Sequence, residues 1–558
     1  MASRTRIRTV MAALLAAVAA GAAAGCGIPA LGGENGRGSG GRGPGPAGAA
    51  TECPRVDPPD DADGRQLRGM WIATVAGIDW PKDTADTAAE QKRQFTRLLD
   101  TATDMKLNAV FVQIRPNSDA FYPSPYEPWS QWITGTQGKD PGYDVLAFMI
   151  KEARARNLEF HAWFNPYRIS RQDDLKKLSP KSPARQHPDW VRKYGKGLWY
   201  DPGLPQVRDL ATRVVMDVVT KYDIDAVHFD DYFYPYPEGG AQFPDQATYK
   251  AHGRGADKDD WRRENVNTLV RTLSEKIHDA KPWVRFGISP FGVWRNKSTD
   301  PAGSATRALQ SYDDVYADTR TWIKKGWIDY VTPQLYWPIG DPRADYAELV
   351  RWWADQVDGT GVQLTIGQGA YRVGADAAWK NPAELSRHLT LNAEHPEVRG
   401  DVFFSASDIA ANKRGFADRL RADHYARPAI PPAADHPGRP RDDTAPPPAV
   451  RNTTATPLDG VRDSAAGVRV TWRSATATAT DADADADAAS YAVYRVDGER
   501  PGCAPVDPAH LIGHVRGPRL DDPTARPGRT YTYYVTALNS LHHQSRPGRG
   551  ATVTTPQG

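Results

Sequence analysis

The feature that most constrains the fold is a regular alternation of strand-like and helix-like segments between residues 65 and 426. The strand-like segments are short apolar runs at residues 67–75, 108–115, 158–168, 225–233, 284–293, 328–337, 362–371 and 400–406. Between them, apolar residues recur at the three- and four-residue spacing of one helix face, at residues 88–105, 143–156, 206–222, 261–280, 313–325, 345–356 and 382–395. Strands that alternate with helices in this way are typical of parallel βαβ units.

The number of strand-like segments selects among parallel architectures. Eight parallel strands close into a barrel, so we predict an α/β fold, a (β/α)8 TIM-type barrel, over residues 65–426. An open, doubly wound sheet is the alternative. No glycine fingerprint for a dinucleotide follows the first strand, however, and no cofactor is predicted.

The first 26 residues have the three-part pattern of a secretory signal. A basic start is followed by an apolar run at residues 10–20, which is too short for a membrane-spanning helix. The small residues before Cys26 then resemble a bacterial lipobox, in which the cysteine is lipidated and becomes the first mature residue. Ordinary cleavage nearby is the alternative. We therefore predict an extracytoplasmic protein that is held at the membrane by a lipid on Cys26, or is secreted.

The region after the signal is poor in large apolar residues. Residues 27–64 are rich in Gly, Pro and Asp and are predicted to be a flexible tether. Cys53 in this tether and Cys503 near the end of the chain are the remaining cysteines, and an extracytoplasmic location would permit a disulfide between them. Their spacing gives no support for a zinc site.

A second, smaller domain is expected after the barrel. Residues 427–448 are a proline-rich, semi-extended linker, and residues 449–558 contain alternating strand patterns at 468–472, 491–495 and 531–537. This set resembles a fibronectin type III module, with a low-complexity loop at residues 475–489. Because it contains no reactive constellation, it is expected to act as a spacer or binding module.

Charge and aromatic content narrow the class of partner. The formal net charge of +2 gives no indication of a nucleic-acid partner, and nothing in the sequence specifies an oligomeric state. The 17 Trp and 23 Tyr residues are concentrated in the barrel region. They are explained either by packing or by a cleft that stacks on sugar rings, because an aromatic face suits the apolar face of a pyranose.

Two adjacent acids end the fourth predicted strand. Asp230 and Asp231 follow an apolar run, where carboxylates are costly unless they are solvated or paired. Active sites of such barrels lie at these carboxyl-terminal strand ends, so the pair is the predicted catalytic centre. A helix cap or a salt bridge is the structural alternative. Strand alternation predicts that Asp230, in line with His228, faces the substrate and that Asp231 points elsewhere.

Glycoside hydrolysis uses two carboxyl groups, one as proton donor and one as nucleophile or base. A substrate with a 2-acetamido group can supply the nucleophile itself, and the second carboxylate then only orients that amide. A neighbouring pair of aspartates suits this variant, because two like charges raise one pKa. Asp79 and Asp119 follow earlier strands and are expected to position the substrate or to support the structure.

Polar and aromatic side chains suited to sugar contacts gather at the same strand ends. The predicted substrate-binding residues are Asp79, Trp80, Arg115, Asp119, His161, Trp163, Asn165, Tyr167, Arg168, His228, Tyr232, Trp294, Gln334, Tyr336 and Trp337. The two histidines are expected to form a hydrogen-bonded layer that supports the acids. A metal set of His161, His228 and Asp230 is the alternative. No compact metal motif such as HExxH occurs, so no metal site is predicted.

Ordered blocks of sequence across the barrel region carry a resemblance to a known family. They are residues 67–75 with 78–81, 113–116 with 119–122, 162–168, 228–235, 287–294 and 333–337. The region resembles the family-10 glycosyl-hydrolase-like group, the domain of unknown function 187, which is distinct from the xylanase family of that number. One departure is Ala76-Gly77, which stands where that family is expected to have an Asn.

The resemblance implies a (β/α)8 barrel, a bacterial envelope location and hydrolysis of glycosidic bonds. Characterised relatives point to peptidoglycan glycan strands stripped of their stem peptides. We therefore expect a lipoprotein glycoside hydrolase that acts on a cell-envelope or extracellular polysaccharide. The rival hypotheses are a non-catalytic carbohydrate-binding lipoprotein and a metal-dependent polysaccharide deacetylase.

Overall fold

The computed structural model describes residues 64–435, 445–458, 467–474, 488–500, 502 and 506–557. The predicted signal segment with Cys26, the tether up to residue 63, and both Cys53 and Cys503 lie outside these ranges. Most of the predicted low-complexity loop also lies outside them. Within the described ranges, no helix is both long enough and apolar enough to cross a bilayer.

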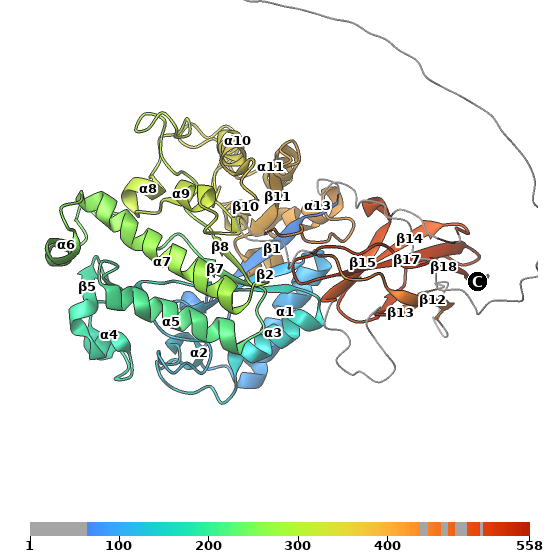
Figure 1. Cartoon of the computed structure of the whole chain (residues 1–558), viewed down its shortest axis with the longest axis horizontal. Helices are drawn as coiled ribbons and strands as arrows, with labels where there is room; N and C mark the ends of the chain where they lie inside the picture. Colours follow the sequence, from blue (N-terminus) through green and yellow to red (C-terminus); the bar gives the residue numbers. More distant parts are fainter. Residues whose placement is uncertain are drawn as a thin grey trace, which may run out of the picture. The chain divides into compact units, whose positions relative to one another are not determined.

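Eight parallel strands close into a barrel, as predicted (Figure 1). The barrel strands are β1 (Leu67–Ile72), β2 (Ala109–Arg115), β3 (Glu159–Phe164), β7 (Ala226–Phe229), β8 (Arg285–Ile288), β9 (Tyr330–Val331), β10 (Gln363–Gln368) and β11 (Val398–Phe403). Their order around the barrel is β1-β11-β10-β9-β8-β7-β3-β2, so each strand pairs with its neighbours in sequence and β11 closes on β1. Most of the strands end earlier than predicted, because their last polar residues belong to the loops that follow.

Helices alternate with the barrel strands along the chain, and several short helices that the apolar periodicity does not predict lie among them. The helices are α1 (Ala88–Asp104), α2 (Gln131–Thr134), α3 (Val145–Ala155), α4 (Pro183–Gln186), α5 (Pro205–Lys221), α6 (Gln246–His252), α7 (Lys258–Ala280), α8 (Ser311–Asp314), α9 (Thr319–Lys324), α10 (Tyr346–Val357), α11 (Glu384–Asn392), α12 (Ala406–Ala411) and α13 (Phe416–Asp423). In α1, Thr87 and Glu90 form a capping box, and Phe95 and Leu99 are buried. The single helix predicted at 313–325 is instead two helices, because Tyr316 between them has a φ of 59°.

Alternate side chains of the barrel strands belong to two different apolar clusters. One side chain in two, including Trp71, Phe111, Trp163 and Tyr330, points into the barrel and forms an inner cluster. The intervening side chains, such as Val110 and Val112, pack outward under the helices in a much larger cluster. The barrel is therefore a filled core rather than a pore.

A small antiparallel sheet that the sequence patterns did not predict follows β3. It has the order β4-β6-β5, formed by β4 (Arg168–Ser170), β5 (Val191–Tyr194) and β6 (Gly197–Tyr200). Arg168 pairs with Trp199 in register, and Ser170 pairs with Leu198. Because β4 begins only four residues after β3 ends, this sheet lies at the carboxyl end of the barrel strands.

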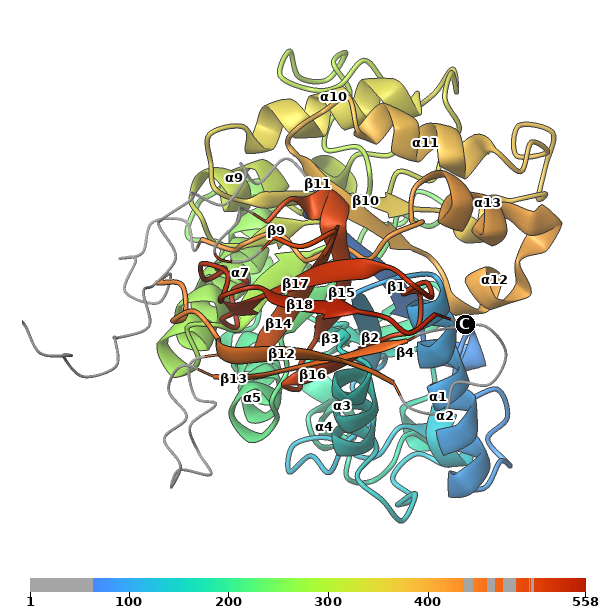
Figure 2. The same ribbon diagram turned by 90° about the vertical axis from the view of Figure 1, so that its right-hand side faces the viewer.

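The C-terminal region is all-β, as predicted. Its strands are β12 (Arg451–Pro457), β13 (Val468–Arg473), β14 (Ser490–Asp497), β15 (Leu511–Val515), β16 (Arg519–Asp522), β17 (Thr530–Leu538) and β18 (Ala551–Thr554). They form a three-stranded sheet, β12-β13-β16, and a four-stranded sheet, β15-β14-β17-β18 (Figure 2). Trp472, Tyr491 and Tyr533 belong to the core between the two sheets.

The amino-terminal ends of the barrel strands contact this all-β region. The Nε2 atom of His542 lies 2.5 Å from Oε1 of Glu159 at the start of β3, and Arg65 donates to the His542 carbonyl at 2.8 Å. In the predicted linker, Ile430 is buried and its carbonyl accepts from the Gln66 N–H at 2.9 Å. Residues 427–435 of the predicted linker therefore pack against the start of the barrel.

Candidate active site

A cavity of about 390 Å³ opens at the carboxyl ends of the barrel strands. Its lining comes from segments that are far apart in the sequence and that meet only because the barrel closes. The lining residues are Trp71, Ala73, Val75, Ile78, Gln113, Trp163, Asn165, Arg168, Arg171, Asp230, Asp231, Tyr232, Ser289, Gln334, Tyr336, Tyr371 and Phe404. Asp230 and Asp231 are the two acids among these described residues, and both are buried.

Both aspartates face this cavity. Strand β7 ends at Phe229, and the chain bends at Asp231. Alternation of side chains holds only while the backbone stays extended, so it does not apply beyond Phe229. The expectation that Asp231 points away from Asp230's side of the strand is therefore wrong.

The carboxylate of Asp230 is held by two donors. Its Oδ2 atom accepts from the Asn165 side-chain amide at 2.5 Å, and its Oδ1 atom accepts from the Tyr232 backbone N–H at 3.0 Å. Burial, reinforced by the neighbouring charge of Asp231, raises the pKa of Asp230 to about 7. This carboxyl group can therefore carry a proton at neutral pH.

Different groups hold Asp231. Its Oδ1 atom accepts from the Gln334 side-chain amide at 3.0 Å, and its Oδ2 atom accepts from the Tyr236 hydroxyl. Burial raises the pKa of Asp231 as well, although both hydrogen bonds favour the charged form. Because a negative charge on one buried carboxyl group disfavours a charge on its neighbour, the two groups do not both ionise readily.

A chain of amides fixes the orientation of Asp230. The Oε1 atom of Gln113 accepts from the backbone N–H groups of Thr74 and Val75, at 3.0 and 2.9 Å. Its Nε2 atom must then be the donor to Oδ1 of Asn165, at 2.7 Å. The Asn165 amide can consequently present only its N–H to Asp230. The backbone after β1 thus positions a carboxylate that follows β7.

Aromatic side chains form much of the remaining wall. Trp71, Trp163, Tyr232, Tyr336, Tyr371 and Phe404 all line the cavity. Tyr371 is 39% exposed, so it lies at the open rim, while Trp71 and Trp163 are buried at the base. Rings at both levels can cover the apolar faces of bound sugars.

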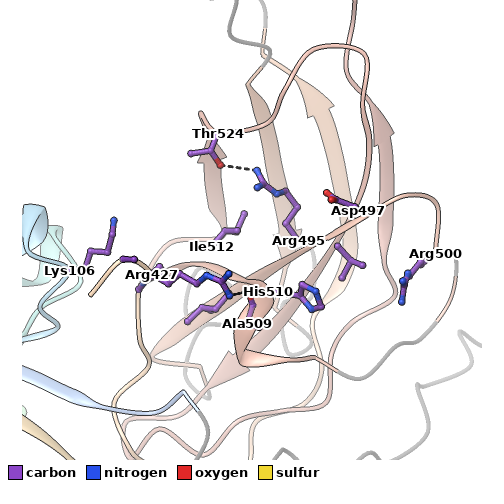
Figure 3. A pocket seen from close by; sticks show the side chains of 13 residues that line it. Lys106, Arg427, Arg495, Asp497, Arg500, Ala509, His510, Ile512 and Thr524 are labelled. Carbon is purple, nitrogen blue, oxygen red and sulfur yellow. Dashed lines mark hydrogen bonds between the residues drawn. The ribbon is translucent and has the colours of Figure 1, made fainter. Parts of the chain in front are cut away.

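A larger hollow, of about 530 Å³, involves the all-β region and contains neither aspartate of the pair. Figure 3 shows several basic side chains in its lining, among them Arg427, Arg495, Arg500 and His510. One of them, Arg495, donates to Oγ1 of Thr524 at 2.8 Å. Because glycosidic chemistry needs acid groups that can exchange a proton, the cavity with the aspartate pair is the candidate active site.

Residues 66–383 match the model of the family described as glycosyl hydrolase-like 10. The chain belongs to this family. A Bacillus subtilis (strain 168) protein, glycosyl hydrolase YngK, is 46% identical over 498 residues, which cover 88% of this chain and 93% of YngK. Glycosyl hydrolase DigH from Escherichia coli (strain K12) is 41% identical over 362 residues, which cover 61% of this chain and 82% of DigH.

One solved structure with a similar fold is the PgaB (BpsB) glycoside hydrolase domain from Bordetella bronchiseptica. It is 14% identical, covers 64% of this chain and 98% of that domain, and superposes with a TM-score of 0.42. A likeness at this level concerns only the barrel, and nothing about the site rests on it.

Several residues predicted to bind substrate lie outside the cavity of this glycosyl hydrolase-like barrel. Asp79 accepts from the Ala73 N–H at 2.8 Å and from the Ser405 hydroxyl at 2.7 Å, so it ties the loop after β1 to the end of β11. Trp80 is fully buried, and its indole N–H donates to the Gln91 carbonyl at 2.8 Å. Both residues support the wall from behind, so the prediction of substrate contact is wrong for them.

The polar residues after β2 are also structural. Arg115 forms a buried ion pair with Glu127, with its Nε atom 2.7 Å from Oε2. Asp119 is buried away from the cavity, where burial raises the pKa of its carboxyl to about 7 and Gln137 donates to it at 3.3 Å. Tyr167 is fully buried. The side chains of Arg115 and Asp119, and that of Tyr167, which follows β3, are buried and are not among the lining residues, so the prediction of substrate contact is wrong for them.

Two predicted tryptophans pack among other aromatic rings instead of lining the cavity. Trp294 is buried and stacks on Trp352, with ring centroids 5.9 Å apart. Trp337 lies edge-on to Phe291, with ring centroids 5.5 Å apart, and is not among the lining residues of the cavity. The prediction of substrate stacking is wrong for the buried Trp294, and for the partly exposed Trp337 it stays a prediction.

The two histidines lie below the cavity, inside the barrel. His228 contacts the Trp71 indole N–H at 3.2 Å, the Ser289 hydroxyl at 2.9 Å and the Tyr330 hydroxyl at 3.1 Å. His161 contacts the same Tyr330 hydroxyl at 2.9 Å and Glu159 below it at 3.1 Å. Burial lowers the pKa of both rings. They form the supporting layer that was predicted, so their predicted contact with substrate is wrong.

The alternative metal set of His161, His228 and Asp230 is not assembled. Among the described residues, no group of three or more His, Cys, Asp or Glu side chains is arranged to hold a metal ion. The Tyr330 hydroxyl lies between the two imidazole rings, and Asp230 is bound to Asn165 instead.

Of the predicted substrate contacts, six line the cavity: Trp163, Asn165, Arg168, Tyr232, Gln334 and Tyr336. Sequence reasoning missed Trp71, Gln113, Arg171, Ser289, Tyr371 and Phe404. Gln113 and Ser289 stand near the ends of predicted strands, and this position in the sequence indicates that they can line the cavity. Trp71 lies within β1, and the inward period-two register of that strand would have found it.

Proposed function

We propose that the chain is a glycoside hydrolase that cleaves an N-acetylated polysaccharide of the cell envelope, with Asp230 and Asp231 as its catalytic pair. The observation that carries this proposal is the buried aspartate pair that lines a cavity with aromatic walls, on a barrel of the glycosyl hydrolase-like 10 family. The names of YngK and DigH, both glycosyl hydrolases, support the reaction class.

Asp230 acts as the proton donor in this proposal. With a pKa near 7 it can hold a proton at neutral pH and pass it to the leaving glycosidic oxygen. Asp231, which accepts from Tyr236 and Gln334, is the member that stays charged. Its carboxylate is placed to orient a group of the substrate or to stabilise developing positive charge.

The nucleophile is supplied by the substrate itself. The two acids follow one strand, and no third carboxylate is present among the described lining residues of the cavity. A mechanism with carboxyl groups on opposite faces of the sugar ring would need such a group. An acetamido group at C2 can attack the anomeric carbon in its place, with Asp231 holding the amide.

The proposal also includes an extracytoplasmic location of the protein and a fibronectin type III-like module at its C-terminus. The signal pattern before Cys26 supports an extracytoplasmic, lipid-anchored protein, which would meet envelope glycans directly. The two-sheet C-terminal region, with its strands of alternating pattern, supports a fibronectin type III-like module.

Digestion of purified glycans tests the proposal. We expect the protein to release products from peptidoglycan strands freed of stem peptides and to do so less well from intact peptidoglycan, with products identified by mass spectrometry. The anomeric configuration should be retained, and a thiazoline mimic of the cyclised acetamido group should inhibit. An inverted product would contradict the substrate-assisted mechanism, and no product from any N-acetylated glycan would contradict the activity.

The pH profile tests the role of Asp230. Because the donor must be protonated, kcat/KM should fall as the pH rises through about 7. In Asp231→Asn the like charge that helps to raise the pKa of Asp230 is gone, so the residual activity should decline at a lower pH than in the wild type. Arg168 is the positively charged neighbour of both acids, and its opposing effect is the same in the two proteins. An unmoved alkaline limb would exclude Asp230 as the donor.

A further inference from the structure

A continuous chain of hydrogen-bonded side chains runs through the inside of the barrel, from the candidate active site to the all-β C-terminal region. At the carboxyl end of the strands, His228 contacts Trp71 and Ser289, which line the cavity. At the opposite end, Glu159 is bonded to His542, which lies between β17 and β18. The buried residues of this histidine chain are His228, Tyr330, His161 and Glu159.

The positions of the hydrogen atoms in the histidine chain follow from the chemistry of its groups. An indole N–H can only donate, so Nε2 of His228 accepts from Trp71 and the one hydrogen of the His228 ring is on Nδ1. That N–H donates to the Tyr330 hydroxyl at 3.1 Å. The hydroxyl has a single hydrogen, which it donates to Nδ1 of His161 at 2.9 Å. Each of these hydrogen bonds therefore points away from the cavity.

Glu159 is the acceptor in which the histidine chain ends. Because Nδ1 of His161 accepts, the hydrogen of that ring is on Nε2, which lies 3.1 Å from Oε2 of Glu159. The Nη2 atom of Arg285 lies 2.6 Å from the same oxygen, and its 3.4 Å separation from Nε2 of His161 is a contact between two donors. The other oxygen, Oε1, accepts from Nε2 of His542 at 2.5 Å. Burial opposes the charge of Glu159, but Arg285 and the two histidines hold the pKa of its carboxyl well below its usual range.

The cavity end of the histidine chain reaches one of the two catalytic candidates. Ser289 contacts Nε2 of His228 through its hydroxyl at 2.9 Å, and its carbonyl accepts from the Gln334 side-chain amide at 3.0 Å. The same amide nitrogen donates to Oδ1 of Asp231 at 3.0 Å. A displacement of His228 would therefore disturb a donor of Asp231 together with the Trp71 ring of the cavity wall.

We propose that His542 is a positioning residue of the candidate active site, which it reaches through Glu159 and the histidine chain. This inference rests on the proposed function, and it gives the all-β region a part in catalysis. Loss of the His542 donor would leave a buried carboxylate with an unsatisfied oxygen. Glu159 would respond by turning or by taking up a proton, and either change weakens the acceptor of His161. Tyr330 and His228 would then lose the arrangement that the carboxylate imposes on them.

The experiment compares His542→Leu with His542→Gln in the full-length protein. Leucine fills a similar volume without a donor, whereas the glutamine amide can bring an N–H close to the position of Nε2. His542 has a φ of 63°, and both replacements meet the same backbone strain, so the difference between them isolates the donor. On peptidoglycan strands freed of stem peptides, we expect kcat/KM to fall by about tenfold in His542→Leu and to stay within about threefold of the wild type in His542→Gln.

His543→Leu is the matched control. His543 is the next residue in the same loop, and its Nε2 atom lies 3.1 Å from the Ala434 carbonyl, in the segment that packs against the barrel. Its replacement disturbs the contact of the all-β region but keeps the donor to Glu159, so kcat/KM should be unchanged. If either His543→Leu or His542→Gln lost as much activity as His542→Leu, the effect would belong to the docking of the region, and the proposal would be overturned.

Nuclear magnetic resonance of protein with isotope-labelled histidine observes the histidine chain without a substrate. In the wild type, the hydrogen of His228 should be on Nδ1 and that of His161 on Nε2. Both signals should change in His542→Leu and should be kept in His542→Gln and His543→Leu. A hydrogen on Nε2 of His228, or signals that do not respond to His542→Leu, would contradict the proposal.

The two measurements together separate this inference from the proposed activity. If the wild type cleaves no glycan but the signals of His161 and His228 depend on His542 as expected, the proposed function fails and the role of His542 in holding the cavity wall stands. If the wild type cleaves the glycan and His542→Leu cleaves it equally well, the role of His542 fails, whatever the signals do, and the proposed function stands.

Discussion

Replacement of either aspartate of the pair, by Asp230→Asn or by Asp231→Asn, is expected to lower kcat/KM by about a thousandfold while the protein stays folded. The removal of a positioned proton donor typically costs between about a hundredfold and ten-thousandfold. The fold should survive because asparagine has nearly the same shape as aspartate. Burial already disfavours the charged form of both acids, so loss of the charge removes an unfavourable interaction. Each variant also loses one accepted hydrogen bond, because an amide nitrogen cannot accept, so thermal unfolding should occur close to the wild-type temperature.

The two variants should differ from each other in a way that assigns their roles. An aryl glycoside with an activated phenol as leaving group needs no proton from the enzyme. Asp230→Asn should therefore recover much of its rate on such a substrate, whereas Asp231→Asn should remain slow because its role does not depend on the leaving group. The reverse pattern would exchange the two assignments.

Asp119→Asn is the control for these variants. Asp119 is also buried, and burial raises the pKa of its carboxyl to about 7, but it does not line the cavity. Its replacement should leave kcat/KM within a few-fold of the wild type. Full activity in both Asp230→Asn and Asp231→Asn would remove the pair from the catalytic centre.

Gly287→Ala is expected to destabilise the protein by about 3–5 kcal/mol, the largest effect that we foresee for a single methyl group. Gly287 lies on β8 beside Tyr330 of β9, and a Cβ atom there would stand 2.1–2.3 Å from three carbons of the Tyr330 ring. That ring cannot move freely, because its hydroxyl lies between His161 and His228. The methyl group would therefore disrupt packing and at least one buried hydrogen bond together.

The measurement is the free energy of unfolding in urea, with activity as a second readout. Activity should fall even in the folded fraction, because His228 also contacts Trp71 and Ser289, which line the cavity. Gly517→Ala is the matched control: no atom lies within 4 Å of its added Cβ, so stability should change by less than about 0.5 kcal/mol. A stable Gly287→Ala protein would show that the Tyr330 ring can shift without cost.

Position after a strand predicts the cavity lining for some residues and not for others. Asn165, Arg168 and Gln334 were predicted from their position at strand ends, and they line the cavity. Arg115 and Trp294 satisfied the same criterion but are buried elsewhere. A sequence pattern shows that a polar or aromatic residue follows a strand. It does not show whether the next loop turns toward the barrel mouth or away from it.

The sequence by itself determined the eight-stranded barrel, the all-β C-terminal region and the place of Asp230 and Asp231 at the end of β7. These depend on periodicity and on chain order, which are local properties. Only the tertiary structure decided that both acids face one cavity and that Gln113 and Asn165 orient one of them. Those relations join residues from different strands and loops, and they arise when the barrel closes and brings all its strand ends to one rim.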